Sequence, residues 1–285
     1  MKILIVGCGY IGTALGEKFI SLGSQVWGLR RDEGALKAIA AKGISPVQAD
    51  LLLPETLKSL PGADVVVLCQ GLSRKTDNYG DTYERGTVNL ISALQGMKPK
   101  KIISISSTSV YSTHDGSWVD EATDPAAMGY ESKESEQNAA SLLAAEKAVL
   151  TSGTPSNVFR LAGIYGPGRN RMRLLREGRM APSFSEIYTN RIHRDDIFSG
   201  IMLLMEKGKP GEIYIGADDY PSTQKEFYSW IYGQLNLKIP ENIPSETEKR
   251  MHVSNRRCSN KKIKTLGLVL KYPSFKEGYA ELIHE

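Results

Sequence analysis

Six residues near the amino terminus constrain the fold most. The run Gly7-Cys8-Gly9-Tyr10-Ile11-Gly12 follows a short apolar segment, Ile3–Val6, and opens a stretch with helical apolar spacing, Tyr10–Leu22. A second apolar segment, Gln25–Leu29, comes next. Glycines between a strand and a helix permit a sharp turn and let backbone amides approach a pyrophosphate, whose charge the helix N-terminus favours. The run predicts a dinucleotide-binding loop, and a purely structural turn is the alternative interpretation.

Strand-like and helix-like segments alternate over the first 161 residues. The segments predicted as buried strands are Ile3–Val6, Gln25–Leu29, Ile44–Ala49, Val65–Cys69, Ile102–Ser106 and Val158–Leu161. The predicted helices are Tyr10–Leu22, Ala35–Ala41, Thr82–Gln95 and Ser135–Leu150. Such alternation predicts an α/β fold of the Rossmann type, with a doubly wound parallel sheet.

The regular alternation of strand-like and helix-like segments ends after residue 161. Arginine-rich sequence with many glycines and prolines is followed by a helix (Asp196–Lys207), a strand (Glu212–Ile215), a helix (Thr223–Leu235) and a basic tail. We therefore predict a dinucleotide-binding domain over residues 1–160. Residues 161–285 are predicted to form a small C-terminal substrate lobe, partly packed back on the Rossmann core.

Composition narrows the class of protein. The 285 residues are 41% hydrophobic and 24% charged, with a formal net charge of +4 and a pI of about 8.8. This small excess of positive charge favours a small anionic substrate and is too small to indicate a nucleic-acid partner. The three cysteines have no zinc-type spacing, and neither do His114, His193, His252 and His284, so no metal site is expected. No apolar run is long enough for a signal-peptide core or a membrane span, so a cytoplasmic location is expected.

The end of the second predicted strand bears on the cofactor. Enzymes that use NAD usually carry an acid there for the ribose hydroxyls, whereas this chain has Arg30 and Arg31. Guanidinium groups suit a 2′-phosphate because their planar fork matches phosphate oxygens. NADP is therefore favoured as cofactor. NAD stays open, because Asp32 and Glu33 could serve as the acids beside a solvated arginine turn.

The chain resembles the extended short-chain dehydrogenases, which include sugar-nucleotide epimerases and dehydratases. The resemblance covers nearly the whole chain and rests on the glycine loop, Ala49-Asp50-Leu51, Gly86-Thr87, the segments 106–111, 120–121 and 160–168, and Asn190-Arg191-Ile192-His193-Arg194-Asp195-Asp196. It implies that Gly7, Gly9, Tyr10, Ile11 and Gly12 hold the pyrophosphate. It further implies roles for Asp50 and Leu51 at the adenine, Gln70 and Gly71 at the central ribose region, and Ile164 at the nicotinamide.

Departures from the family concern the catalytic residues. The family uses a Ser or Thr, a Tyr as general acid/base, and a Lys four residues later, on the same helix face, that lowers the Tyr pKa. Ser107 matches the first member. Tyr130 is followed by Lys133 at i+3, which breaks the spacing. In the register we prefer, Asn138 and Leu142 take the Tyr and Lys positions, and Tyr130 and Lys133 lie in an inserted loop.

Catalysis in this register needs another proton donor, and Ser107 and Tyr130 are the candidates. For Tyr130 a surface role is the alternative interpretation, and Ser107 alternatively only contacts the cofactor. Tyr83 is a further departure, because the family often has Asn there.

Arginines gather in the predicted lobe: Arg169, Arg171, Arg173, Arg176, Arg179, Arg191 and Arg194. Guanidinium groups near a cleft suit a phosphate or diphosphate. Arg169, Arg191 and His193 are the candidate substrate residues, and a solvated helix face or a helix-entry histidine is the alternative.

Two functions remain open. One is an NADP-dependent oxidoreductase or epimerase-like enzyme, formally an oxidoreductase or isomerase, acting on a phosphorylated or nucleotide-linked carbohydrate. The other is a catalytically silent NADP(H)-binding redox sensor, which the missing Tyr-Lys pair favours. A nucleic-acid-binding scaffold is disfavoured by the modest charge. The predicted helices Thr82–Gln95 and Ser135–Leu150 carry apolar stripes that could form a homodimer interface. The same stripes are explained equally well if the two helices cover the sheet.

Overall fold

A seven-stranded sheet organises the computed structural model, which describes residues 1–72, 77–239 and 254–284. The strand order is β11-β7-β5-β4-β1-β2-β3, and the pairs β1/β2, β2/β3, β1/β4 and β4/β5 are all parallel. The order therefore runs in opposite directions on the two sides of β1. In open α/β sheets this switch point, at the carboxyl ends of the strands, is where ligands bind.

The chain divides into two compact units. The first comprises residues 1–107, 133–159 and 204–213, and the second comprises residues 108–132, 160–203 and 214–285. Three boundaries between them fall inside β7 (Ser156–Leu161), α6 (Arg194–Lys207) and β11 (Glu212–Gly216), and the other two lie after residues 107 and 132. We predicted a single boundary between residues 160 and 161. By contacts, residues 108–132 group instead with the second unit and residues 204–213 with the first.

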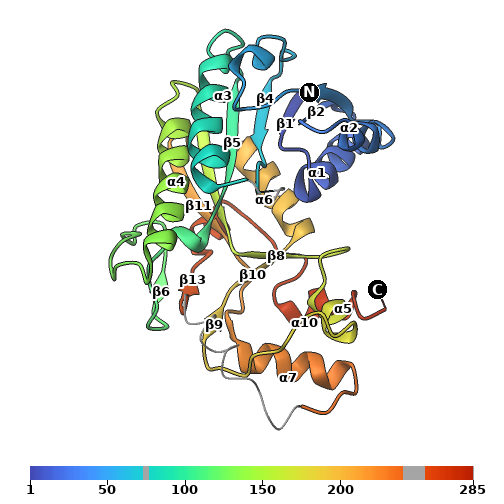
Figure 1. Ribbon diagram of the computed structural model, residues 1–285, viewed down its shortest axis with the longest axis vertical. Helices are drawn as coiled ribbons and strands as arrows, with labels where there is room; N and C mark the ends of the chain where they lie inside the picture. Colours follow the sequence, from blue (N-terminus) through green and yellow to red (C-terminus); the bar gives the residue numbers. More distant parts are fainter. Residues whose placement is uncertain (73–76, 240–253, 285) are drawn as a thin grey trace. The chain divides into compact units, whose positions relative to one another are not determined.

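The first unit contains the alternating part of the sequence. Its elements are β1 (Lys2–Val6), α1 (Tyr10–Ser21), β2 (Gln25–Arg30), α2 (Glu33–Ala40), β3 (Ser45–Gln48), a 3₁₀ turn (Pro54–Leu57), β4 (Val65–Leu68), a π-helical turn (Gly80–Arg85), α3 (Gly86–Leu94), β5 (Lys101–Ser107) and α4 (Lys133–Leu150). Helices α1 and α2 lie on one side of these strands, and α3 and α4 lie side by side on the other (Figure 1). The predicted doubly wound α/β fold is confirmed.

The second unit is built from short elements. They are a 3₁₀ turn (Thr108–Val110), β6 (Trp118–Val119), β8 (Gly163–Tyr165), α5 (Arg171–Arg176), β9 (Tyr188–Thr189), β10 (Arg191–His193), α6 (Arg194–Lys207, whose last turn belongs to the first unit), β12 (Ser222–Thr223), α7 (Gln224–Gln234), β13 (Arg257–Cys258), α9 (Lys261–Thr265) and α10 (Phe275–Ala280). Three two-stranded pairs join β8 to β10, β9 to β12 and β6 to β13.

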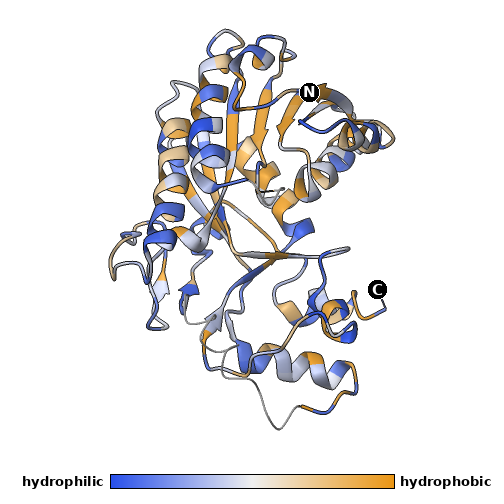
Figure 2. Cartoon of the chain, in the orientation of Figure 1, coloured by the Kyte–Doolittle hydropathy of each residue, from blue (hydrophilic) through white to orange (hydrophobic). Residues whose placement is uncertain are grey.

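Apolar side chains make the core of each unit. In the first unit the strands carry the hydrophobic colours of Figure 2, and Leu4, Val66 and Ile102 are fully buried on neighbouring strands. In the second unit Phe227 and Phe275 are fully buried with several tyrosines around them. Burial of apolar surface on this scale is the dominant favourable contribution to folding.

Two expectations about helices change. The predicted helix Thr82–Gln95 is a π-helical turn running into α3, and such turns occur frequently at functional sites. Lys133, which we placed in an inserted loop, is the first residue of α4. Its polar first turn is helical because Glu134 and Glu136 are good helix formers whose charges suit a helix N-terminus.

Candidate functional site

The glycine loop lies between β1 and α1, at the switch point of the sheet. Gly7 has a φ of 78°, and a Cβ there would come within 2.6 Å of the backbone of Gln70, which follows β4. At Gly12 a Cβ would meet the Ile5 side chain at 2.8 Å, so this glycine lets α1 pack directly on β1. The α1 N-cap, Gly9, makes no side-chain capping bond. The first amides of α1 are thus left without a side-chain acceptor, as an anion-binding helix start requires.

The two arginines after the loop have different surroundings. Arg30 ends β2, and its Nη1 lies 3.0 Å from the place a Cβ on Gly9 would take. Within the described ranges its guanidinium has no hydrogen-bond or ion-pair partner. Arg31 instead donates to Asp77 at 2.9 Å, with side-chain exposures of 28% and 8%. Arg30 therefore offers an unengaged guanidinium at the loop, whereas Arg31 is held by a carboxylate.

Residues after β3 and β4 complete this region. One carboxylate oxygen of Asp50 accepts from the Leu52 amide at 2.9 Å, and the Leu51 carbonyl accepts from Asn89 at 2.7 Å. Gln70 donates to Thr87 at 2.6 Å and to the Thr82 carbonyl at 3.2 Å. Its own Oε1 is buried and has no partner among the described residues.

The π-helical turn carries Tyr83, which the sequence marked only as a departure from the family. The Tyr83 hydroxyl lies 3.8 Å from the position of a Cβ on Gly71, and burial raises the pKa of Tyr83 to about 12. Tyr83 therefore keeps its proton at neutral pH. The start of α1 has no side-chain cap, the glycine loop leaves room at the backbone, and Gln70 Oε1 has no partner among the described residues. These three features fit a bound dinucleotide in this unit.

The carboxyl end of β5 and the face of α4 bear on catalysis. Ser107 ends β5 and is half-buried, while the neighbouring Ser106 donates to Glu146 of α4 at 2.6 Å inside the core. Asn138 is half-buried on α4, and Leu142 is 2% exposed on the same helix. An aliphatic side chain at 142 supplies neither charge nor proton.

Tyr130 belongs to the second unit and precedes α4. Its hydroxyl donates to the Val110 carbonyl at 2.8 Å, so its proton is used in a backbone contact. Ile164, the residue expected near the nicotinamide, lies half-buried on β8.

The three candidate substrate residues differ in burial. Arg169 is exposed, whereas Arg191 is buried on β10, with its guanidinium carbon 3.7 Å from the Phe227 ring centre. Arg191 donates to the Ser222 hydroxyl at 2.8 Å, and no carboxylate forms an ion pair with it in the described part of the chain. Burial lowers the pKa of its guanidinium.

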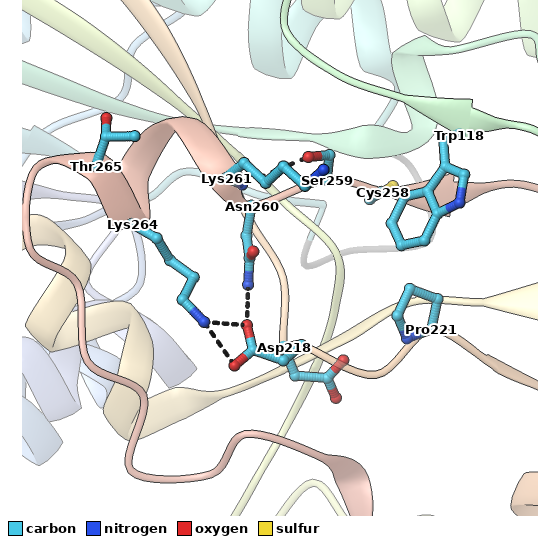
Figure 3. Close-up of a pocket in the computed structure, with 10 residues that line it drawn as sticks. Trp118, Asp218, Pro221, Cys258, Ser259, Asn260, Lys261, Lys264 and Thr265 are labelled. Carbon is cyan, nitrogen blue, oxygen red and sulfur yellow. Dashed lines mark hydrogen bonds and ion pairs between the residues drawn. The ribbon is translucent and has the colours of Figure 1, made fainter.

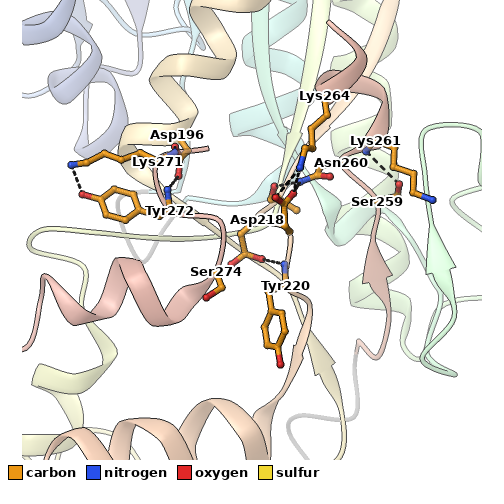
Figure 4. Close-up of polar contacts among 12 residues, drawn as sticks. Asp196, Asp218, Tyr220, Ser259, Asn260, Lys261, Lys264, Lys271, Tyr272 and Ser274 are labelled. Atoms are coloured by element: carbon orange, nitrogen blue, oxygen red, sulfur yellow. Dashed lines mark hydrogen bonds and ion pairs between the residues drawn. The ribbon is translucent and has the colours of Figure 1, made fainter. Parts of the chain in front are cut away.

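His193 is also buried, and it serves the start of α6. Its Nδ1 accepts from the Asp195 amide at 3.2 Å, and its ring centre lies 3.9 Å from that of Tyr272. Burial lowers the pKa of His193 to about 4, so the imidazole is neutral at pH 7. Asp196 at the same helix start accepts from the amides of Lys271 and Tyr272 at 2.7 and 3.1 Å, as Figure 4 shows.

A pocket that the sequence did not indicate also lies in the second unit. Figure 3 shows its lining, which joins residues of β6 and β13, the segment after β11, and α9. At one side Asp219 accepts from Lys264 and from Asn260. Asp218, next to it, is 2% exposed.

The described residues contain neither a metal-binding cluster nor a membrane-spanning helix. There, no group of three or more His, Cys, Asp and Glu side chains is arranged to hold a metal ion. No helix in those ranges is both long and apolar enough to cross a membrane. His252, one of the four histidines considered above, lies outside the described residues.

Comparison with protein families agrees with the geometry of the loop and sheet. The model of the NAD dependent epimerase/dehydratase family matches residues 3–216, which spans the seven strands of the sheet. The chain belongs to the NAD dependent epimerase/dehydratase family. The resemblance to extended short-chain dehydrogenases is thereby confirmed at the level of family and fold.

Several members and structures are similar to this epimerase/dehydratase chain. Protein YeeZ of Escherichia coli (strain K12) is 29% identical over 249 residues, covering 84% of this chain and 86% of YeeZ. A conserved protein of unknown function from Silicibacter pomeroyi DSS is 27% identical with a TM-score of 0.80, over 99% of this chain and 98% of that one. The human epimerase family protein SDR39U1 (isoform 2), solved with NADPH, is 18% identical with a TM-score of 0.79 over the full length of both. This last likeness bears on the fold alone.

Proposed function

We propose that this chain is an NADP-dependent enzyme of the epimerase/dehydratase type. The observation that carries the cofactor preference is the Arg30 guanidinium, which lies beside Gly9 and has no partner among the described residues. In NAD enzymes this strand end carries an acid for the ribose hydroxyls, and a cation here suits a 2′-phosphate instead.

The remaining cofactor contacts are proposed from the loop geometry and the family resemblance. Gly7, Gly9, Tyr10, Ile11 and Gly12 would hold the pyrophosphate at the start of α1. Asp50 and Leu51 would hold the adenine, Gln70 and Gly71 the ribose region, and Ile164 the nicotinamide side. The unpartnered Oε1 of Gln70 can accept a ribose hydroxyl, which would satisfy a buried acceptor. The nicotinamide ring, when bound, supplies hydride transfer.

Proton transfer is proposed to depend on residues other than the usual pair. With Asn138 and Leu142 at the family's Tyr and Lys positions, α4 offers no general acid/base there. Ser107 is our preferred catalytic candidate because it is half-buried at the carboxyl end of β5. Tyr130 is the weaker candidate, since its hydroxyl already donates to Val110.

The proposed substrate is a phosphorylated or nucleotide-linked carbohydrate. Arg191 supports an anionic group because its guanidinium is buried without an ion-pair partner in the described residues. Arg169, which is exposed, would add charge at the surface. The contacts of His193 favour a role at the start of α6 over a substrate contact. A homodimer and a cytoplasmic location stay predictions.

A second candidate function is a catalytically silent NADP(H) sensor. The observation that favours it is Leu142, an aliphatic residue that is 2% exposed and takes the position of the family's catalytic Lys in the register that we prefer. Such a protein would bind NADPH as tightly as an enzyme but would not consume it.

Turnover and binding together test both functions. The full-length protein is titrated with NADPH and NADH, and NADPH oxidation or sugar conversion is then followed with a panel of aldehydes, ketones and nucleotide sugars. The enzyme predicts NADPH-selective binding together with turnover that Ser107→Ala lowers. Binding without turnover across the panel favours the sensor, and binding of neither nucleotide by the folded protein overturns both.

A further inference from the structure

A cavity of about 740 Å³ lies within the second unit. Its size is in the range of sites for small organic ligands. None of the residues that we assign to the cofactor or the substrate lines it. The lining residues are Trp118, Asp218, Asp219, Pro221, Cys258, Ser259, Asn260, Lys261, Lys264 and Thr265.

Asp218 carries the argument for a ligand. Its carboxyl is almost completely buried, and one oxygen accepts from the Tyr220 amide at 3.2 Å (Figure 4). The other oxygen, Oδ2, is buried with no hydrogen-bond partner in the described ranges. Burial raises the pKa of Asp218, although the positive charge of Arg191 opposes this, and a raised pKa favours the protonated carboxyl, which can donate a hydrogen bond. A buried polar atom without a partner is costly, and a ligand oxygen in the cavity would satisfy it.

The lysines give the cavity a cationic side. Lys264 is neutralised by Asp219, which accepts from it at 2.8 and 2.9 Å. The Lys261 ammonium has no hydrogen-bond or ion-pair partner among the described residues, whereas its backbone amide donates to the Ser259 hydroxyl. A protonated Asp218 would leave the positive charge of Lys261 unbalanced in the lining.

The other side of the cavity is apolar. Trp118 is 54% exposed although it is a large aromatic residue, and Pro221 and Cys258 line the cavity with it. Exposed indole surface beside a cavity provides a flat face against which a planar ring can stack. The lining therefore combines a flat apolar face, a buried hydrogen-bonding carboxyl and an unpaired ammonium.

We propose that this cavity binds a small organic carboxylate with a planar apolar body. Its carboxylate would accept the hydrogen bond from Asp218 and pair with Lys261, and its ring would lie against Trp118. A hydrogen bond from a protonated carboxyl to an anionic oxygen is stronger than one between neutral groups. None of the residues assigned to the cofactor lines this site, whereas Asp218 interacts electrostatically with Arg191, the proposed substrate residue.

Calorimetric titration of the full-length protein with sodium benzoate tests the site, with benzyl alcohol and benzylammonium as neutral and cationic ligands of the same shape. We expect saturable benzoate binding with one site per chain, and none for the other two up to about 20 mM. Lys261→Gln should weaken benzoate about fivefold. Its matched control is Lys262→Gln, because Lys262 lies over the Tyr214 ring and does not line the cavity.

Two variants of Asp218 separate its donor role from its role in folding. Asp218→Asn keeps a hydrogen-bond donor and should retain benzoate affinity within about threefold, whereas Asp218→Ala should lose about tenfold or more. The Lys261 variant keeps the test valid if Asp218→Ala fails to fold. Absence of saturable benzoate binding, equal binding of benzyl alcohol, or equal losses in Lys261→Gln and Lys262→Gln would overturn the proposal.

Discussion

Replacing Arg30 by Ala should weaken NADPH binding far more than replacing Arg31. The Arg30 guanidinium lies beside Gly9 and has no partner among the described residues, so a 2′-phosphate would be its first strong acceptor. Hydrogen bonds between charged groups contribute about 1.5–3 kcal/mol, which corresponds to about 10- to 100-fold in affinity. NADH lacks the phosphate, and its affinity should change by less than about threefold in the same variant.

Arg31 provides the matched comparison. To reach a phosphate it would have to leave or share Asp77, so Arg31→Ala should weaken NADPH by less than about fivefold. It should instead lower the free energy of unfolding by about 1–2 kcal/mol, because Asp77, 8% exposed, loses its cation. That figure sits below the values for fully buried pairs because Arg31 is 28% exposed.

Fluorescence titration of NADPH and NADH against the wild type and both variants measures this contrast. Two results would refute the reasoning. One is an equal loss of NADPH and NADH affinity in Arg30→Ala, which would assign Arg30 a structural role in the loop. The other is a larger loss of NADPH affinity in Arg31→Ala than in Arg30→Ala.

Three further predictions follow from single contacts. Asp77→Asn removes the charge that holds Arg31 and should strengthen NADPH, not NADH, by about two- to fivefold in the same titration; equal affinities would show that Arg31 is out of reach. Gly278→Ala should destabilise the fold by about 1–3 kcal/mol in urea unfolding, because its Cβ would overlap the buried Tyr165 hydroxyl, whereas Gly233→Ala on α7, with open space, should be neutral or stabilising. The pKa of His193 is lowered to about 4, so between that pH and its unfolded value near 6.5 the unfolded chain binds the extra proton and stability falls as pH falls. His193→Asn should therefore reduce the loss of unfolding free energy between pH 7 and pH 5, and an unchanged slope would contradict the assignment.

The sheet and the loop were predictable because short-range signals specify them. Predicted strands such as Ile3–Val6 and Gln25–Leu29 match β1 and β2 to within one residue at each end. Apolar runs bounded by glycine or polar residues suffice for buried parallel strands. The glycine loop was equally clear, since Gly7 and Gly12 meet steric demands set by Gln70 and Ile5 next to them in space.

Long-range pairings could not be predicted in the same way. Arg30 and Arg31 are adjacent residues of the same type, and the sequence alone does not distinguish them. Their surroundings differ because Asp77, 46 residues after Arg31, pairs with Arg31. Asp218 and Asp219 are likewise adjacent acids, yet one is buried with an unpartnered oxygen and the other pairs with Lys264. Which member of a charged pair is buried depends on tertiary contacts that local patterns do not encode.

The register of α4 links packing to the question of activity. The buried face of this helix includes Ala139, Leu142, Glu146 and Val149, at the three- and four-residue spacing of a helix that covers a sheet. A lysine at 142 would put an ammonium on that buried face, where its charge is costly unless it pairs with a carboxylate such as that of Glu146, which already accepts from Ser106. In the register that we prefer, Leu142 satisfies the packing and leaves α4 without the charge that lowers a tyrosine pKa in the family. We propose that chemistry in this chain then draws its proton from Ser107 at the end of β5, from Tyr130 or from the substrate, so cofactor binding and turnover need separate measurements.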